Sequence, residues 1–358
     1  MIGTKYIAVI CNYVLKPERI GGMDRFFVAY DSACKERGLR VDWFFSHCKP
    51  HSFYENLNVF ASENTSAIEQ FFNQDITSKR YDIVITHFVE LCTPMFRKIK
   101  TAHHSYIIAI DHNPRPIQGF PLKKRIKNRI KGRLYGRNID CFGGVSQYTV
   151  DHILMDYGKQ IAGKTHLVYN GIDTSIYKKR TEENFGRMIV ASHLRESKGI
   201  QDLIEAVNLL SAQLKNMLKI DIFGEGPSEK VLKAKVADYN LEQQIVFNGS
   251  SSKLPELLQG YSFLLQPTYM ECFSLSILES LAANVPVITT PVGGNPEIII
   301  NGYHGFLFKA GDIRELASIL EKVLEKDLII GKDVSTKIVR EFSLEKMVQG
   351  HLKLLPCT

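Results

Sequence analysis

The sequence has no apolar run that approaches the roughly 20 residues a membrane-spanning helix needs. Its seven cysteines are scattered singly, without any Cys-x-x-Cys pair, which favours reduced thiols in the cytoplasm over a disulfide framework. The N-terminal segment has one short apolar run, residues 7–11, and no small-residue cleavage site, so it predicts a first strand rather than a signal peptide. These absences predict a cytoplasmic globular protein.

Apolar residues make up 44% of the 358-residue chain and charged residues 23%, enough to build a large core. This composition excludes disordered, collagen-like and low-complexity classes. The length predicts two domains, because a common domain has about 100–200 residues.

Short β-rich runs alternate with helical patterns in both halves of the chain. Helical patterns include residues 23–37 and the run IQDLIEAVNLLSAQL. This alternation is typical of parallel sheets with crossover helices. It stops at the polar, turn-rich residues 168–187, which predict a domain boundary. We expect two doubly wound α/β domains, with ligands bound in a cleft at the carboxyl ends of the strands. The strand-like runs are YIAVICNY, VDWFFS, YDIVITHF and SYIIAIDHN, then MIVASHL, LKIDIFG, QIVFNG, SFLLQP and PVITT.

One segment, residues 122–137, concentrates positive charge. Residues 123–137 contain eight basic residues and no acidic one. A helix here has an apolar stripe, which either packs on its own domain or contacts an anionic membrane surface. Nucleic acid is a weaker interpretation, because Tyr135 is the one aromatic residue among the cations and no nucleic-acid module is recognisable. The stripe consists of Leu122, Ile126, Ile130 and Leu134.

Residues 266–282 predict an anion site, because a strand ends there and a helix begins near residues 274–276. The first backbone N–H groups of a helix have no partner within the helix and attract negative charge. Here they belong to Phe273, Ser274 and Leu275.

Two glutamates flank this predicted helix start. Glu279 is either a ligand-binding residue or the end of a capping box, Ser276-x-x-Glu279. Glu271 lies on the loop, where its carboxylate has no evident capping role, so we expect it to bind a ligand.

The Glu-x7-Glu pattern in this setting resembles the retaining glycosyltransferases of family 4, which have the two-domain GT-B fold. Fragments of the same pattern occur in order along most of the chain. They are Gly21-Gly22, DIVITH at 82–87, DHNPRP at 111–116, VSQYT at 145–149, NGID at 170–173, SHLRESKG at 192–199, FGEGP at 223–227, TTPVGGNPE at 289–297 and FSLEKM at 342–347.

The resemblance implies two Rossmann-like domains facing a cleft. Residues 1–170 would bind the acceptor, residues 171–342 the nucleotide-sugar donor, and residues 343–358 would form a helix returning to the first domain. The implied reaction moves a sugar from a nucleotide diphosphate with retention of anomeric configuration, as in bacterial surface-polysaccharide synthesis.

The sequence has no Asp-x-Asp, the device with which many other glycosyltransferases hold a metal. We therefore expect no metal or cofactor, with Arg195, Lys198 and the helix N-terminus stabilising the diphosphate. The arginine of the family pattern falls on His193 here, so His193 and Arg195 stay alternatives for one contact. Either residue could make this contact, because positions i and i+2 of an extended chain, here 193 and 195, face the same side.

The resemblance also assigns the remaining site residues. His112 and Glu271 would be catalytic, and His87 would lie near the acceptor. His87 has a second interpretation as a buried, hydrogen-bonded core histidine. Gly22 and Gly224 would approach the donor closely, together with Glu279.

The predicted function is hexosyl transfer from a UDP sugar, favoured over a GDP sugar, to a glycan or lipid-linked acceptor. The alternatives are a nucleotide-sugar epimerase of the same fold and a non-catalytic nucleotide-sugar-binding partner of another transferase. The predicted location is cytoplasmic, with peripheral contact to the inner membrane face through residues 122–137. No nucleic-acid partner is expected.

Overall fold

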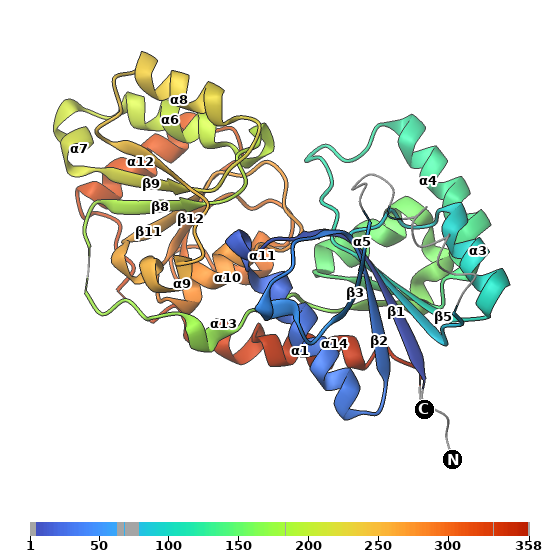
Figure 1. Cartoon of the computed structure of the whole chain (residues 1–358). Helices are drawn as coiled ribbons and strands as arrows, with labels where there is room; N and C mark the ends of the chain where they lie inside the picture. Colours follow the sequence, from blue (N-terminus) through green and yellow to red (C-terminus); the bar gives the residue numbers. More distant parts are fainter. Residues whose placement is uncertain (1–4, 63–67, 69–78, 183, 332, 357–358) are drawn as a thin grey trace. The chain divides into compact units, whose positions relative to one another are not determined.

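The computed structural model describes residues 5–62, 68, 79–182, 184–331 and 333–356. The chain divides into two compact units (Figure 1). Unit 1 comprises Met1–Gly171 and Leu344–Thr358, and unit 2 comprises Ile172–Ser343. Each unit has a parallel sheet with crossover helices, so the predicted α/β fold with two Rossmann-like domains is confirmed. The roles assigned to the two domains and the cleft between them stay predictions.

Within the described residues, unit 1 has a seven-stranded parallel sheet in the order β3-β2-β1-β4-β5-β6-β7. Strands β1 to β3 are added toward one edge of the sheet and β4 to β7 toward the other, so the strand order reverses between β1 and β4. Doubly wound folds bind their ligands at this position. The register pairs Cys11 with His87, and His87 with Ile110, so β4 and β5 end at nearly the same level while β1 continues to Leu15. The strands are β1 (Tyr6–Leu15), β2 (Arg40–Cys48), β3 (Asn58–Ala61), β4 (Ile83–His87), β5 (Tyr106–Asp111), β6 (Cys141–Gly144) and β7 (Thr165–Leu167).

The strands of this sheet are apolar because both faces are buried. Five of the six residues of β5, YIIAID, are buried, as expected for a parallel strand that helices cover on both sides. The core on one face contains Phe44, Phe96, Ile107 and Phe142. The α-helices of unit 1 are α1 (Gly22–Glu36), α3 (Pro94–His103), α4 (Leu122–Tyr135), α5 (Gln147–Tyr157) and α14 (Leu344–Leu352).

Helix α14 joins unit 1 from the far end of the described chain. It packs against α1, and Figure 1 draws it in red beside the blue α1. The His351 ring of α14 lies 4.5 Å from the Phe26 ring of α1, centroid to centroid. Met347 Sδ accepts a hydrogen bond from the backbone N–H of Gly171 at 3.2 Å. The first unit is therefore built from two separate parts of the sequence.

Helix α4 does not pack through its apolar stripe. The stripe residues are 52–69% exposed, whereas Asn128 and Gly132 of the same helix are buried. Gly132 permits a close approach to α5, because a Cβ atom there would lie 2.0 Å from the carbonyl oxygen of Tyr157. The interpretation that the stripe packs on its own domain is therefore wrong. None of the described helices combines the length and apolarity that crossing a bilayer requires.

Unit 2 has a six-stranded sheet in its described part, in the order β10-β9-β8-β11-β12-β13. All of its strand pairs are parallel. The strands are β8 (Arg187–Ala191), β9 (Lys219–Phe223), β10 (Ile245–Gly249), β11 (Phe263–Gln266), β12 (Val287–Thr289) and β13 (Gly305–Leu307). The α-helices are α6 (Ile200–Leu209), α7 (Ala212–Met217), α8 (Glu229–Asp238), α9 (Leu254–Leu257), α10 (Leu275–Ala282), α11 (Asn295–Ile298), α12 (Ile313–Leu324) and α13 (Thr336–Glu341).

Candidate functional site

Lys198 and Glu271 meet at the carboxyl edge of the unit 2 sheet. The ammonium Nζ of Lys198 lies 2.9 Å from Oε2 of Glu271, with the side chains 21% and 16% exposed. Lys198 ends a short 3-10 helix after β8, and Glu271 lies on the loop after β11. Backbone contacts join the two loops, because the N–H of Tyr269 donates to the carbonyl of Ser197 at 2.8 Å. The structure thus brings together two residues that the sequence predicted for the site.

The loop after β12 packs directly on the loop that carries Glu271. Gly293 has a φ of 64°, and a Cβ atom there would lie 1.8 Å from the carbonyl oxygen of Glu271. Its neighbour Gly294 donates its N–H to the carbonyl of Cys272 at 2.8 Å. A larger residue at Gly293 would push the two loops apart, since both the positive φ and the short distance require glycine.

Helix α10 begins two residues earlier than the predicted capping box requires. Ser274 is the N-cap residue, and its Oγ accepts a hydrogen bond from the backbone N–H of Ile277 at 3.4 Å. Gln266 at the end of β11 fixes the cap, because its Nε2 donates to Oγ of Ser274 at 2.7 Å and to Oγ of Ser276 at 3.0 Å. The capping box Ser276-x-x-Glu279 is therefore wrong, and Glu279 lies half-buried within the helix rather than at a cap.

The predicted anion site at the start of α10 keeps its geometry. Phe273, Ser274 and Leu275 precede, cap and begin the helix, so their backbone N–H groups lie at its positively polarised N-terminus. Phe273 is 3% exposed and its ring packs 5.2 Å from that of Phe342. The binding of a ligand there stays a prediction.

His193 and Arg195 flank Leu194, which is fully buried. Both flanking side chains are exposed, and Arg195 has extended backbone angles, with φ −124° and ψ 151°. The two residues therefore lie on the solvent side of the same short segment, and both stay candidates for the diphosphate contact. Gly224 approaches this segment from β9, because a Cβ atom there would lie 1.9 Å from the carbonyl of Ser192.

In unit 1, Gly22 is buried at the first position of α1, where the chain leaves β1. The buried carboxylate of Asp24 fixes this turn. Its Oδ2 accepts the N–H of Gly21 at 2.9 Å and the hydroxyl of Tyr13 at 3.0 Å, and its Oδ1 accepts the hydroxyl of Tyr54 at 2.8 Å. The carboxylate also suits the first turn of a helix, where negative charge is stabilised.

His87 and His112 form a buried pair at the ends of adjacent strands. Nδ1 of His87 lies 2.9 Å from Nε2 of His112. Burial, reinforced by His351, lowers the pKa of His112 to about 3. Burial, with the charges of His112 and His351, holds the pKa of His87 well below its usual value. Both rings are therefore neutral near pH 7, and the N–H of one ring donates a hydrogen bond to the bare nitrogen of the other.

His351 of α14, which no sequence motif indicated, completes this cluster. Its ring lies 5.7 Å from the ring of His87 at an interplanar angle of 27°. Its Nδ1 donates to the carbonyl of Met347 at 2.8 Å, and burial lowers its pKa to about 4. The family resemblance implies that residues 343–358 form a helix returning to the first domain, but no local signal indicates which side chains that helix contacts.

A buried charge cluster surrounds Arg115, and no sequence motif indicated it. Its Nη2 lies 2.7 Å from Oδ2 of Asp111, and its Nε lies 3.0 Å from Oδ2 of Asp156. Burial lowers the pKa of Arg115, but the two carboxylates outweigh it and the net shift is upward. Arg115 also donates to the carbonyl of Asn113. The cluster fixes the loop after β5, on which His112 lies.

The two halves of the chain match two family models. Residues 20–176 match the model described as Glycosyltransferase Family 4, and residues 172–337 match the model described as Glycosyl transferases group 1. The chain belongs to glycosyltransferase family 4. Family membership favours sugar transfer over the predicted epimerase and non-catalytic alternatives.

Two relatives of this glycosyltransferase come from bacteria. It is 28% identical over 197 residues to an N-acetyl-α-D-glucosaminyl L-malate synthase of Bacillus anthracis, covering 51% of each chain. It is 30% identical over 200 residues to the putative colanic acid biosynthesis glycosyltransferase WcaL of Salmonella typhimurium, covering 52% of this chain and 49% of the relative. The chain thus spans about half the length of these relatives.

Among solved structures, the glycosyltransferase is similar to HepE of Anabaena in complex with UDP-glucose. The TM-score is 0.78 at 17% identity, and the match covers 98% of this chain and 100% of HepE. This likeness agrees with the GT-B fold of two parallel-sheet domains.

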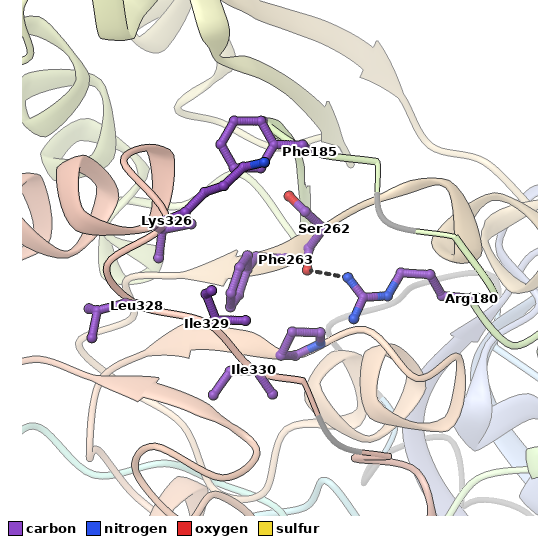
Figure 2. Close-up of a pocket in the computed structure, with 11 residues that line it drawn as sticks. Arg180, Phe185, Ser262, Phe263, Lys326, Leu328, Ile329 and Ile330 are labelled. Atoms are coloured by element: carbon purple, nitrogen blue, oxygen red, sulfur yellow. Dashed lines mark hydrogen bonds between the residues drawn. The ribbon is translucent and has the colours of Figure 1, made fainter.

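A pocket of this glycosyltransferase lies away from the candidate site (Figure 2). It is at the amino ends of β8, β11 and β12, whereas Lys198 and Glu271 follow carboxyl ends. Figure 2 shows Arg180 directed at Ser262, whose carbonyl accepts its Nη1 at 3.2 Å, and Lys326 next to Phe185. The pocket is therefore not the predicted donor site.

Among the residues described, no group of three or more His, Cys, Asp or Glu side chains is arranged to hold a metal ion.

The change Glu279→Gln tests a donor contact in this glycosyltransferase. If the carboxylate accepts hydrogen bonds from the donor ribose, UDP affinity falls by about 1.5–3 kcal/mol, the range for hydrogen bonds to a charged group. The side chain keeps its shape, so we expect the free energy of unfolding to change by less than about 1 kcal/mol. Titration calorimetry with UDP measures the affinity. Glu321→Gln, at an exposed position of α12, is the matched control, and unchanged UDP binding by both variants would contradict a role for Glu279.

Proposed function

We propose that the protein moves a hexose-type sugar from a UDP sugar to a glycan or lipid-linked acceptor, with retention of anomeric configuration, in cell-surface polysaccharide synthesis. The observation that carries this proposal is the Lys198–Glu271 pair, 2.9 Å apart, on loops next to the start of α10. UDP-glucose in HepE supports a UDP sugar, and the colanic acid enzyme WcaL supports a surface polysaccharide.

The chemistry requires positive charge at the leaving group. As the glycosidic bond breaks, the diphosphate gains negative charge and the sugar becomes oxocarbenium-like. Lys198 would meet this charge, together with either His193 or Arg195 and the backbone N–H groups of residues 273–275. Fixed positive groups of this kind stabilise a transition state without a metal ion. Glu271 would hold Lys198 in place and contact the transferred sugar.

The histidines of unit 1 suit the acceptor and sugar side of the reaction. His112 and His87 are neutral and share a hydrogen bond, so they can orient a hydroxyl but add no charge near an oxocarbenium-like sugar. Gly22, at the start of α1, would allow close approach of the donor. The acceptor would be met at the inner face of a membrane.

Donor hydrolysis tests the proposal, because a transferase without acceptor slowly transfers its sugar to water. We expect the protein to release UDP from a UDP sugar at the same rate in EDTA and in Mg²⁺, with the α-anomer as first product by NMR. GDP-mannose should react more slowly than UDP-glucose.

Three results would contradict parts of this proposal. Loss of activity in EDTA, restored by Mg²⁺ or Mn²⁺, would overturn metal independence. A β-anomer would overturn retention, and an epimerised UDP sugar without release of UDP would support the epimerase instead.

A further inference from the structure

Helix α4 presents a row of large apolar side chains to solvent. Leu122, Ile126, Ile130 and Leu134 are 69%, 53%, 53% and 52% exposed. Side chains four residues apart lie on one face of a helix, so the four form a continuous apolar stripe. Single exposed apolar residues are common on protein surfaces, but a contiguous exposed row indicates an interaction surface.

The opposite face of α4 fixes the orientation of the stripe. Asn128 and Gly132 are buried, and Gly132 lies against the backbone of Tyr157. Lys131 Nζ lies 2.7 Å from Oε1 of Glu90, and Arg129 Nε donates to the carbonyl of Met155 at 3.2 Å. Because these contacts hold the far side of the helix against unit 1, the helix cannot rotate to bury its stripe.

The charge around the stripe determines which partner fits it. Residues 123–137 contain eight basic residues and no acidic one. Lys123, Lys127 and Arg133 are exposed. Because each residue of a helix turns by 100°, these three side chains lie within or beside the apolar row. A second copy of this chain would bring like charges together. A nucleic acid would leave the apolar stripe without a partner, whereas an anionic bilayer satisfies both features.

We propose that α4 docks on an anionic membrane surface, with its apolar stripe at the boundary of headgroups and acyl chains and its basic residues among the headgroups. The inference deepens the proposed function and rests on it for the acceptor alone, because a lipid-linked acceptor would be met at such a surface. The docking itself depends on α4 and not on catalysis.

Sedimentation with vesicles tests the docking. The protein should bind phosphatidylglycerol vesicles, bind phosphatidylcholine vesicles at least tenfold more weakly, and dissociate as NaCl rises from 0.1 M to 1 M. The salt dependence follows because the Debye length shrinks from about 10 Å to about 3 Å over that range.

Two variants separate charge from apolar insertion. The triple change Lys123→Glu, Lys127→Glu and Arg133→Glu should reduce the bound fraction at least tenfold, and so should the double change Ile126→Ser and Ile130→Ser. Lys131 is left intact, since it pairs with Glu90. A matched control is Leu209→Ser with Val231→Ser, which removes two apolar side chains of unit 2 that are at least as exposed as Ile126 and Ile130, and which should leave vesicle binding unchanged.

Several results would overturn the docking of α4. They are a wild type that fails to bind anionic vesicles, a triple variant that still binds them, or a double serine variant that binds as well as the wild type. Hydrolysis of a soluble UDP sugar by the same variants should stay at the wild-type rate. If the wild type binds vesicles through α4 but hydrolyses no donor, the docking stands and the proposed function fails.

Discussion

Replacing Lys198 with alanine is expected to lower kcat for donor hydrolysis about 100-fold. The change removes a positive charge that would stabilise the departing diphosphate, a contribution of about 3 kcal/mol to the transition state. The effect should fall mainly on kcat, because the negative charge increases as the glycosidic bond breaks. Glu271 would lose its partner at 2.9 Å, but both side chains reach solvent, so the fold should persist.

The control for this prediction is Lys233→Ala. Lys233 also forms an ion pair in unit 2, with Nζ 2.6 Å from Oε1 of Glu229 on α8. Steady-state kinetics with a UDP sugar should show wild-type turnover for Lys233→Ala and the large loss for Lys198→Ala alone. Near-wild-type turnover of a folded Lys198→Ala protein would move the stabilising role to Arg195, His193 or the start of α10.

Replacing Arg115 with methionine is expected to destabilise unit 1 by about 3–5 kcal/mol. The guanidinium lies between the carboxylates of Asp111 and Asp156, and all three side chains are at most 5% exposed. Removing one partner from a buried charge cluster leaves uncompensated charges in a site that water does not reach. Methionine fills a similar volume, so the loss would come from charge rather than from a cavity.

Urea unfolding monitored by tryptophan fluorescence measures this loss. The chain has one tryptophan, Trp43, which is fully buried in β2 and therefore reports on unit 1. Arg187→Met is the control, because Arg187 pairs with Asp221 at 3.1 Å while 55% exposed, and exposed pairs contribute about 0–1 kcal/mol. An Arg115→Met protein with a loss below about 1 kcal/mol would show that the buried cluster adds no more than a surface pair.

The sheets could be predicted from the sequence because each strand is an apolar run that is recognisable without knowledge of its neighbours. YIAVICNY became β1 and YDIVITHF contains β4, since parallel strands buried on both faces must be almost continuously apolar. The pairing of His87 with His112 needed more than this pattern. It depends on β4 and β5 being neighbours, and strand order is a property of the whole sheet.

The parts that sequence analysis got wrong or missed depend on contacts distant in the chain. The predicted capping box failed because Gln266 supports Ser274 from another element, and a local motif cannot indicate that. The stripe of α4 faces outward because Gly132 allows closer packing than a leucine would. Asp156 is 41 residues from Arg115, so no spacing rule links the two.

Unit 1 also has a consequence for synthesis of the chain on the ribosome. Its last helix, α14, follows all of Ile172–Ser343, so a nascent unit 1 lacks the His351 ring that packs on Phe26 until the second unit has been translated. At about 5–20 residues per second, roughly 170 residues take about 10–30 s. During that interval the surface of α1 that α14 covers would be open to chaperones, and unit 2, which is continuous in sequence, could complete its fold first.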